Sequence, residues 1–538
     1  MAILKKHYLV IFLFILSFFQ LKSFYNSFWP RSHDGIYHAI RIKEYFYELT
    51  GGQVPVRWAN NLDNRYGLPL FNYIYPGPYL LSSLPMFLGF NEISSYKIII
   101  FFAYFLGLTG IYSLYYRQNK YLAAAAALIF GLTPYIFLDI FVRGAFGEFL
   151  AIAFMPWAIY GFTYRHRLIS VLSLFFVLIC HNFLGLIFLL FIIANLIWNA
   201  SFTRFTLKNI FFSLGLSAFF LIPMIVERKF IISGLTNNFT FDYRQHFLFF
   251  PQLIYGKWDY WYSNPGPVDG MSFQLGFANL VIILFSLLSL PFLKKKRLLI
   301  FLLISLFFFL ILTLSPSQFI WNLITPLQML QFPWRLLFIP TLVFPLIFFE
   351  SLFNHSKLKL PSKYLFAIFL IILAMINVRN YRRPMEYIPQ EKYQILLNDE
   401  GQKSTTSSRD EISPIWSKTV KTNGNRVIDV TRGGEVLVQI NSNAMYFDIT
   451  SQSPVTEITI LKNYFPGWKL QNRQNLEEVS IKPDQNGDVL AFLPKGSYVY
   501  KYFQTKTEIF SNLISLSIFL LLLLISIKEF VQKKYGKN

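Results

Sequence analysis

Ionisable side chains lie where long apolar runs of this sequence end. His33 and Asp34 follow the first run in the stretch SHDGIYHAIR, and Arg143 and Glu148 follow a later run in DIFVRGAFGE. A carboxylate can accept the proton of an attacking hydroxyl group, and a guanidinium can stabilise a leaving phosphate that gains negative charge. These positions therefore offer a general base and a cation at the edge of an apolar environment.

The acids among these residues also have structural interpretations. Asp34 precedes a segment with helical periodicity, and Asp is a favoured helix N-cap. Glu148 follows Arg143 at a spacing that suits an ion pair, or it is a second acid or metal ligand of a site. His33 is expected to orient Asp34 or a substrate by hydrogen bonding rather than to bind a metal.

Four further residues are candidates for substrate binding. Arg335 begins a run in QFPWRLL, where an arginine either binds a lipid phosphate or extends to the headgroups. His181 stands beside Asn182 between two runs, as a ligand or as part of a polar turn. Arg244 and Tyr75 lie in the aromatic segments FDYRQHFLFFPQLIYGKWDYWY and RWANNLDNRYGLPLFNYIYPGPY. Aromatic, amide and basic side chains of this kind suit sugar and pyrophosphate recognition, although the Arg244 segment also suits packing against the membrane or another domain.

The elements that position these residues are predicted to cross a membrane. Of the 538 residues, 54% are hydrophobic and 14% are charged, and the mean hydropathy is +0.43. The net charge of +21 comes mostly from Lys and Arg clusters between apolar runs, so the expected partners are membrane lipids and not nucleic acid. Cys180 is the only cysteine, which excludes an intramolecular disulfide and a cysteine zinc site.

About twelve runs are long enough to cross roughly 30 Å of hydrocarbon. Basic clusters occupy every second loop, which predicts a plasma-membrane protein with both termini in the cytoplasm. The first run is expected to be an uncleaved anchor rather than a signal peptide, because no small-residue cleavage site follows it. The predicted spans are residues 8–28, 94–115, 121–138, 148–163, 168–181, 183–199, 208–226, 275–293, 298–314, 336–352, 363–380 and 508–527.

Three parts of the chain differ in composition. Residues 1–380 form the predicted multi-span domain, with a long first outer loop at 25–93 that contains an amphipathic surface helix, and with an outer loop at 139–147. Short alternating stretches within 381–506, such as AMYFDIT and GSYVYKYF, predict a β-sandwich outside the membrane. Residues 507–538 are the final span and a basic cytoplasmic tail.

The chain resembles the GT-C superfamily of integral-membrane glycosyltransferases. The resemblance rests on an Asp soon after the first span, long outer loops and an outer β domain. Within that superfamily, HDGIYHAIRIKEYF, PVRWANNLDNRYGLPLFNYIYPGPY, LQFPWRLL and NYFPGWKL resemble the membrane proteins labelled 6-pyruvoyl-tetrahydropterin synthase-related and their YfhO-like relatives.

The resemblance implies transfer of a sugar from a polyprenyl-phosphate carrier to a glycan, lipid or protein acceptor of the envelope, with Asp34 as general base. The resemblance identifies no certain cofactor. A divalent cation remains open, although Asp34 is followed by glycine instead of the paired acids that many members carry. The alternatives are a translocase or other transporter of lipid-linked sugars, which would need ionisable residues at the midplane of the membrane, and a non-catalytic envelope scaffold.

Overall fold

The computed structural model divides into two compact units, each built from separated stretches of the chain. The first unit holds residues 1–35, 96–214 and 235–390, and the second holds 36–95, 215–234 and 391–538. Most of the stretch 25–93, expected to form the first outer loop, thus belongs to the same unit as the C-terminal β strands. The structure describes residues 2–26, 28–232, 242–403, 412–418, 427–432, 436–441, 444–450 and 453–535.

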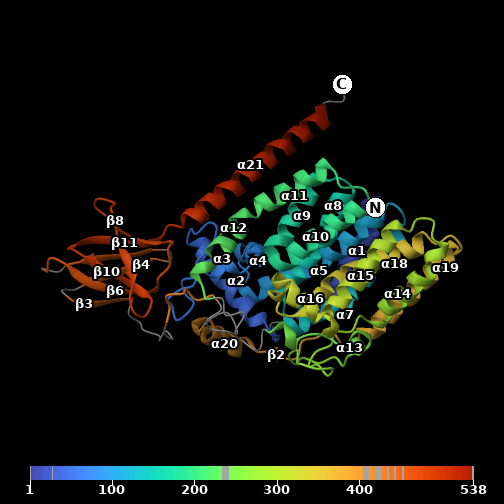
Figure 1. Ribbon diagram of the computed structural model, residues 1–538, viewed down its shortest axis with the longest axis horizontal. Coiled ribbons are helices and arrows are strands. Elements are labelled where there is room, and N and C mark those ends of the chain that lie inside the picture. Colours follow the sequence, from blue (N-terminus) through green and yellow to red (C-terminus); the bar gives the residue numbers. More distant parts are fainter. Residues whose placement is uncertain are drawn as a thin grey trace. The chain divides into compact units, whose positions relative to one another are not determined.

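The first unit is built of apolar helices around α18 (Phe338–Phe353), most of whose side chains are buried (Figure 1). This helix packs against α6, α14 and α15. The other helices are α1 (Ala2–Gln20), α5 (Glu92–Tyr115), α6 (Lys120–Gly131), α7 (Pro134–Phe137), α8 (Phe146–Thr163), α9 (Arg167–Cys180), α10 (Asn182–Trp198), α11 (Arg204–Leu216), α14 (Phe277–Ser289), α15 (Arg297–Thr313) and α19 (Leu360–Asn377).

Short elements lie between these helices. They are the 3-10 turns η1 (Lys22–Phe24), η6 (Tyr243–Gln245), η7 (Leu290–Phe292), η8 (Ser315–Ser317) and η9 (Pro333–Leu337), the π-helix η2 (Leu138–Arg143), the helices α13 (Phe250–Ile254), α16 (Gln318–Leu323) and α17 (Thr325–Gln328), and the paired strands β1 (Trp29–Pro30) and β2 (Tyr387–Ile388).

Several helices are long and apolar enough to cross a membrane. Among the described residues there are five, or seven if each of two bent pairs counts as one span. Every predicted span falls on a helix or on a bent pair, and the count of about twelve crossings stays a prediction. Two boundaries differ from expectation: α1 ends at Gln20 instead of residue 28, and the predicted loop at 139–147 is helical as far as Arg143.

The bend before η2 has a local cause. Asn119 caps α6 by accepting hydrogen bonds from the backbone N–H groups of Tyr121 and Leu122. Pro134 has no N–H to continue this helix and begins α7 instead, so the two segments meet at 49°. The second segment runs on into η2, which ends at Gly144 with φ +64°.

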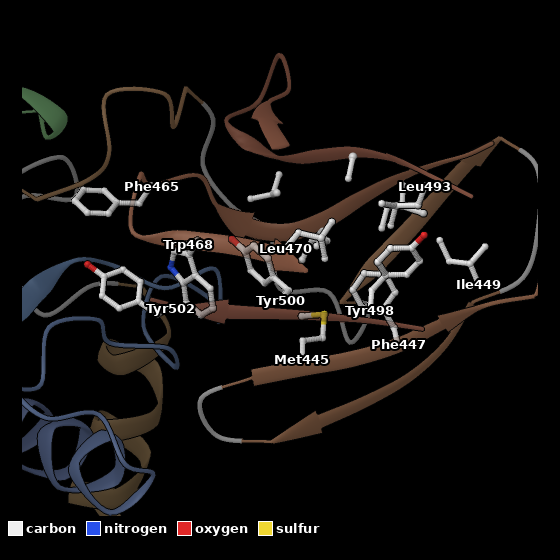
Figure 2. Packing of buried hydrophobic residues seen from close by; sticks show 14 of the residues in the cluster. Met445, Phe447, Ile449, Phe465, Trp468, Leu470, Leu493, Tyr498, Tyr500 and Tyr502 are labelled. Atoms are coloured by element: carbon white, nitrogen blue, oxygen red, sulfur yellow. The ribbon is translucent and has the colours of Figure 1, made fainter. Parts of the chain in front are cut away.

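The β strands of the second unit form a sandwich of two antiparallel sheets, as the alternating stretches predicted. The strand orders are β3-β6-β10-β9 and β4-β5-β11-β7-β8. Apolar side chains from both sheets, among them Ile458, Val489, Phe447 and Tyr498, share one core (Figure 2). The strands are β3 (Ile428–Arg432), β4 (Val436–Asn441), β5 (Ala444–Ile449), β6 (Thr456–Asn463), β7 (Trp468–Asn472), β8 (Glu478–Val479), β9 (Ile481–Pro483), β10 (Asp488–Leu493) and β11 (Gly496–Tyr502).

The remaining elements of this unit are helical. The final helix α21 packs against α12, which in turn packs against α3. The helices are α2 (Gly35–Thr50), α3 (Leu70–Tyr73), α4 (Gly77–Phe87), α12 (Ala218–Val226), the turn η3 (Glu227–Phe230), α20 (Gln390–Lys403) and α21 (Lys506–Tyr535).

Candidate functional site

A buried cluster of charges lies where η2 meets α8. Arg143 Nη2 donates a hydrogen bond to Glu148 Oε2 at 2.8 Å, and Arg143 Nη1 donates to the carboxylate of Asp139. All three side chains are almost fully buried. The two acids are separate in the sequence, but one guanidinium brings them together.

Three more residues surround this cluster. Tyr135 donates to Glu148 Oε1 at 2.5 Å. Arg335 Nε lies 3.8 Å from Glu148 Oε2, and the ring of Trp334 lies under the Arg143 guanidinium at 4.5 Å. The predicted candidates Arg143, Glu148 and Arg335 therefore belong to one site.

The segment that carries His33 and Asp34 is hydrogen-bonded to the end of η2. His33 N donates to Val142 O at 2.9 Å, and Asp34 N donates to Arg143 O at 2.8 Å. The contact requires a glycine at position 144, because a Cβ there would lie 2.3 Å from Ser32 Oγ. Two loops that are distant in the sequence are thus fixed to each other at the charged cluster.

The carboxylate of Asp34 is exposed. It accepts no hydrogen bond and forms no ion pair with any residue that the structure describes, so it does not cap α2 through its side chain. An exposed carboxylate on a fixed backbone is available to a substrate.

His33 is held from two sides. Its Nε2 atom lies 3.0 Å from Tyr260 O, and its ring stacks on Tyr262 at 4.6 Å. Burial lowers the pKa of His33, which keeps the imidazole neutral at neutral pH. These contacts fit the expected orienting role.

The remaining candidates differ in their relation to the cluster. His181 is buried at the start of α10, where its ring accepts a hydrogen bond from Leu184 N at 3.4 Å. It also interacts electrostatically with the charged side chains of the cluster, Glu148, Arg143 and Arg335. Arg244 is exposed and pairs with Asp242 at 2.7 Å, without contact to the charged cluster. Tyr75 belongs to the second unit, where it is half-buried between α3 and α4.

The electrostatics distinguish the two arginines of the cluster. Arg143 is neutralised by two carboxylates and is buried. Arg335 is 18% exposed, and its Nη1 atom donates to Leu330 O and Gln331 Oε1. Within the described chain its Nη2 atom has no acceptor, so Arg335 is the cation that a substrate phosphate can reach.

The donor set of the cluster suits ion pairing more than a metal. Asp139 and Glu148 both face Arg143, which supplies the positive charge that a divalent cation would bring. No group of three or more His, Cys, Asp or Glu side chains is placed to hold a metal ion in the part of the chain that is described.

Two members of the cluster, Tyr135 and Asp139, were not among the predicted site residues. Asp139 and Arg143 are four residues apart, a spacing that pairs side chains only on a helix. Residues 139–147 were expected to form a loop, so this signal was missed.

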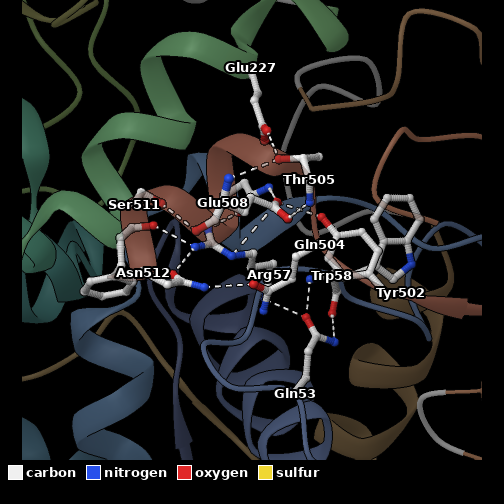
Figure 3. Close-up of polar contacts among 12 residues, drawn as sticks. Gln53, Arg57, Trp58, Glu227, Tyr502, Gln504, Thr505, Glu508, Ser511 and Asn512 are labelled. Atoms are coloured by element: carbon white, nitrogen blue, oxygen red, sulfur yellow. Dashed lines mark hydrogen bonds and ion pairs between the residues drawn. The ribbon is translucent and has the colours of Figure 1, made fainter. Parts of the chain in front are cut away.

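The stretch RWANN, expected to recognise sugars, is instead held in structural contacts of the second unit. Arg57 donates to Asn72 Oδ1 and Asn512 Oδ1, both at 2.7 Å, and lies 4.0 Å from Glu508 (Figure 3). Trp58 is fully buried in the core of the β-sandwich. The first loop and the C-terminal strands therefore share one hydrophobic core.

Comparison with known proteins gives distant similarities only. No protein-family model matches the chain, and no curated protein matches it. Among solved structures, it is similar to the arabinofuranosyltransferase AftD from Mycobacteria, with a TM-score of 0.45 and 15% identity over 73% of this chain and 29% of that one. It is also similar to an oligosaccharyltransferase from Archaeoglobus fulgidus in the apo form, with a TM-score of 0.42 and 11% identity over 74% of this chain and 56% of that one. Likenesses at these scores carry no conclusion about the activity of this chain.

Proposed function

We propose that this chain is a membrane glycosyltransferase of the GT-C type. It transfers a sugar from a polyprenyl-phosphate-linked donor to a glycan, lipid or protein acceptor of the envelope. The reaction takes place at the outer face of the plasma membrane, with the β-sandwich outside and both termini in the cytoplasm. The observation that carries the proposal is the free, exposed carboxylate of Asp34, fixed by its backbone to the charged cluster of Arg143.

The side chains have complementary tasks in this reaction. Asp34 takes the proton from the acceptor hydroxyl as its oxygen attacks the anomeric carbon. The bond from that carbon to the phosphate oxygen breaks, and the lipid phosphate leaves with an added negative charge. Arg335 stabilises this charge through its free Nη2 atom, while Glu148 and Arg143 hold Arg335 and the Asp34 segment in place.

The positions of the acids favour an enzyme over a transporter. Glu92, Glu148, Glu350 and Glu508 each lie in the first or last turn of a helix that is long enough to span a membrane. An ion or proton pathway usually places such residues near the midplane. Acids at the ends of such helices fit a reaction at the membrane surface better than a pathway through the membrane.

Replacement of the base tests the proposal. Asp34→Asn keeps the size of the side chain and removes the basic oxygen, so we expect sugar transfer from a synthetic polyprenyl-phosphate donor to slow by about 10²–10⁴-fold. Asp448→Asn, an exposed change on β5, is the matched control and leaves the rate unchanged. Transfer at the wild-type rate by Asp34→Asn would exclude a catalytic base at this position. If the wild type transfers sugar to no member of an acceptor panel, the translocase and scaffold alternatives gain support.

A further inference from the structure

A cavity opens beside the proposed catalytic segment, within the first unit. It is lined in part by the aromatic segment that was expected to suit sugar recognition. It has a volume of about 670 Å³ and lies between the start of α14 and the end of α19. Its walls come from residues 255–260 and 376–385. Residues that line it and bear on its chemistry are Trp258, Tyr260, Asn377, Arg379, Tyr381 and Arg383.

One wall is a rigid aromatic platform. The rings of Trp258 and Tyr381 stack at 4.0 Å, and Tyr260 meets Trp258 edge-on at 6.3 Å. Gln274 Nε2 donates to the hydroxyl group of Tyr381 at 2.5 Å, and Asn377 donates to it at 3.4 Å. Because these bonds fix the rings, the platform can pack against the apolar C–H face of a sugar with little ordering cost.

Three basic side chains also line the cavity. Arg379 and Arg383 are exposed, and neither forms an ion pair with any described residue. Lys257 also lines the cavity, and its charge is engaged by Asp259 at 3.2 Å. Among the residues that the structure describes, no acidic side chain lines the cavity. Two free guanidinium groups favour a ligand that carries a carboxylate or phosphate, which can accept paired hydrogen bonds.

The cavity wall is bonded to the segment that carries Asp34. Tyr260 O accepts the contact from His33 Nε2, and the hydroxyl group of Tyr260 donates to Arg383 O at 2.8 Å. On the other side, β2 pairs with β1, and Arg31 forms an ion pair with Glu386 at 2.5 Å. A ligand in the cavity is therefore next to the loop that holds the proposed base.

We propose that this cavity binds an acidic saccharide, which is the acceptor of the transfer reaction. The assignment of this saccharide as the acceptor rests on the function proposed above. Its binding is inferred from the side chains of the cavity alone. The platform packs against the sugar rings, and Arg379 and Arg383 bind the acidic group. The reacting hydroxyl group of the bound saccharide is then presented to Asp34, whose segment is bonded to the cavity wall.

A direct binding experiment tests the assignment without turnover. The full chain in nanodiscs of neutral lipid is applied to a panel of uronic-acid and phosphate-bearing oligosaccharides and to their neutral counterparts. We expect binding of acidic members in preference to neutral ones. Arg379→Gln with Arg383→Gln raises the Kd by about tenfold or more, because two charge-assisted hydrogen bonds are lost. Arg432→Gln with Arg473→Gln, which removes two exposed arginines from the β-sandwich, leaves the Kd unchanged.

The lysine variant provides a second measurement. Arg379→Lys with Arg383→Lys keeps the charge but loses the paired geometry, so we expect an intermediate Kd. Equal binding of neutral and acidic members, unchanged binding by the glutamine variant, or no binding to any acidic member would overturn the proposal. Arginine-dependent binding of phosphatidylglycerol in place of glycans would assign the cavity to a lipid headgroup instead. If the glutamine variant loses glycan binding but keeps the wild-type rate of sugar transfer, the bound saccharide is not the acceptor, and the proposed function is left standing.

Discussion

At the scale of single residues, the two arginines of the cluster differ in what surrounds them. Arg143 is buried between two carboxylates, whereas Arg335 keeps an open donor and partial exposure. Removal of a buried cation leaves its carboxylates buried without a counter-charge. This lowers the free energy of unfolding far more than the loss of an exposed group does. Replacement of the two arginines should therefore affect different properties of the protein.

We expect Arg143→Gln to lower stability and Arg335→Gln to lower activity. The first change leaves Asp139 and Glu148 buried without their cation and destabilises the protein by roughly 3–5 kcal/mol. The second keeps this pairing and lowers kcat/KM by about 10²-fold through the lost contact to the leaving phosphate. Thermal unfolding in detergent and transfer assays measure the two effects. Wild-type kcat/KM in Arg335→Gln would refute its role in catalysis.

At the scale of elements, α2 differs from the surface helix that its apolar residues predicted. The helix lies within the stretch 25–93 where it was expected, and Gly52 with φ +93° follows its end. However, its polar face is buried as well: Glu48 accepts hydrogen bonds from the side chain and backbone of Asn60, and Glu44 accepts the corresponding pair from Asn61. Asn60 and Asn61 lie in a loop without periodicity. The hydrophobic pattern of the helix therefore did not predict these hydrogen bonds.

The acids of α2 make stability depend on pH. Burial, and then the charge of Glu44, raises the pKa of Glu48 from 4.5 to about 8. Between these values the folded protein holds a proton that the unfolded chain releases, so the free energy of unfolding falls as the pH rises from about 4.5 to 8, by up to about 1.4 kcal/mol per pH unit. Above pH 8 the trend reverses, because burial lowers the pKa of Lys462 to about 8.

Glu48→Gln should flatten this dependence. The neutral amide cannot release a proton, so the unfolding midpoint of the variant changes less between pH 5 and 8, a range inside the window that Glu48 sets. Glu386→Gln, which alters an exposed acid, keeps the wild-type slope. An equal slope in Glu48→Gln would show that another group titrates.

At the scale of the whole molecule, the second unit joins the first outer loop to the β-sandwich through Trp58. Its ring packs between Phe465, Trp468 and Tyr502 at centroid distances of 5.5 to 5.9 Å. Trp58 is 0% exposed, so the loop completes the core of a domain that lies hundreds of residues later in the chain.

We expect Trp58→Ala to weaken the loop and the sandwich together. The cavity left by the indole costs about 3–5 kcal/mol, and Trp58→Phe costs less because part of the ring remains. Hydrogen exchange should rise both in α2 and in the strands β7 and β11. Faster exchange in the loop alone would contradict a shared core.

The sequence was informative where a pattern is local. Apolar length predicted the helices, alternation predicted the strands, and the position of Asp34 after the first run led to the charged cluster. Contacts between segments that are distant in the sequence leave no periodic pattern. Examples are the contacts of Trp58 with Phe465 and of Tyr260 with His33. The cavity at Trp258 is intermediate. Its aromatic segment was expected to suit sugar recognition, but the stacking of Trp258 on Tyr381 had no signal in the sequence.

The shared core of the second unit also sets an order of events during synthesis. Arg57 and Trp58 leave the ribosome hundreds of residues before Glu508, Tyr502 and Trp468, with which they pack. Until these partners are synthesised, the ring of Trp58 and the guanidinium of Arg57 lack the contacts that bury them in the folded protein. Most of the intervening helices are synthesised during this interval. We therefore expect this core to form only after the strands β7 and β11 and the start of α21 have been synthesised.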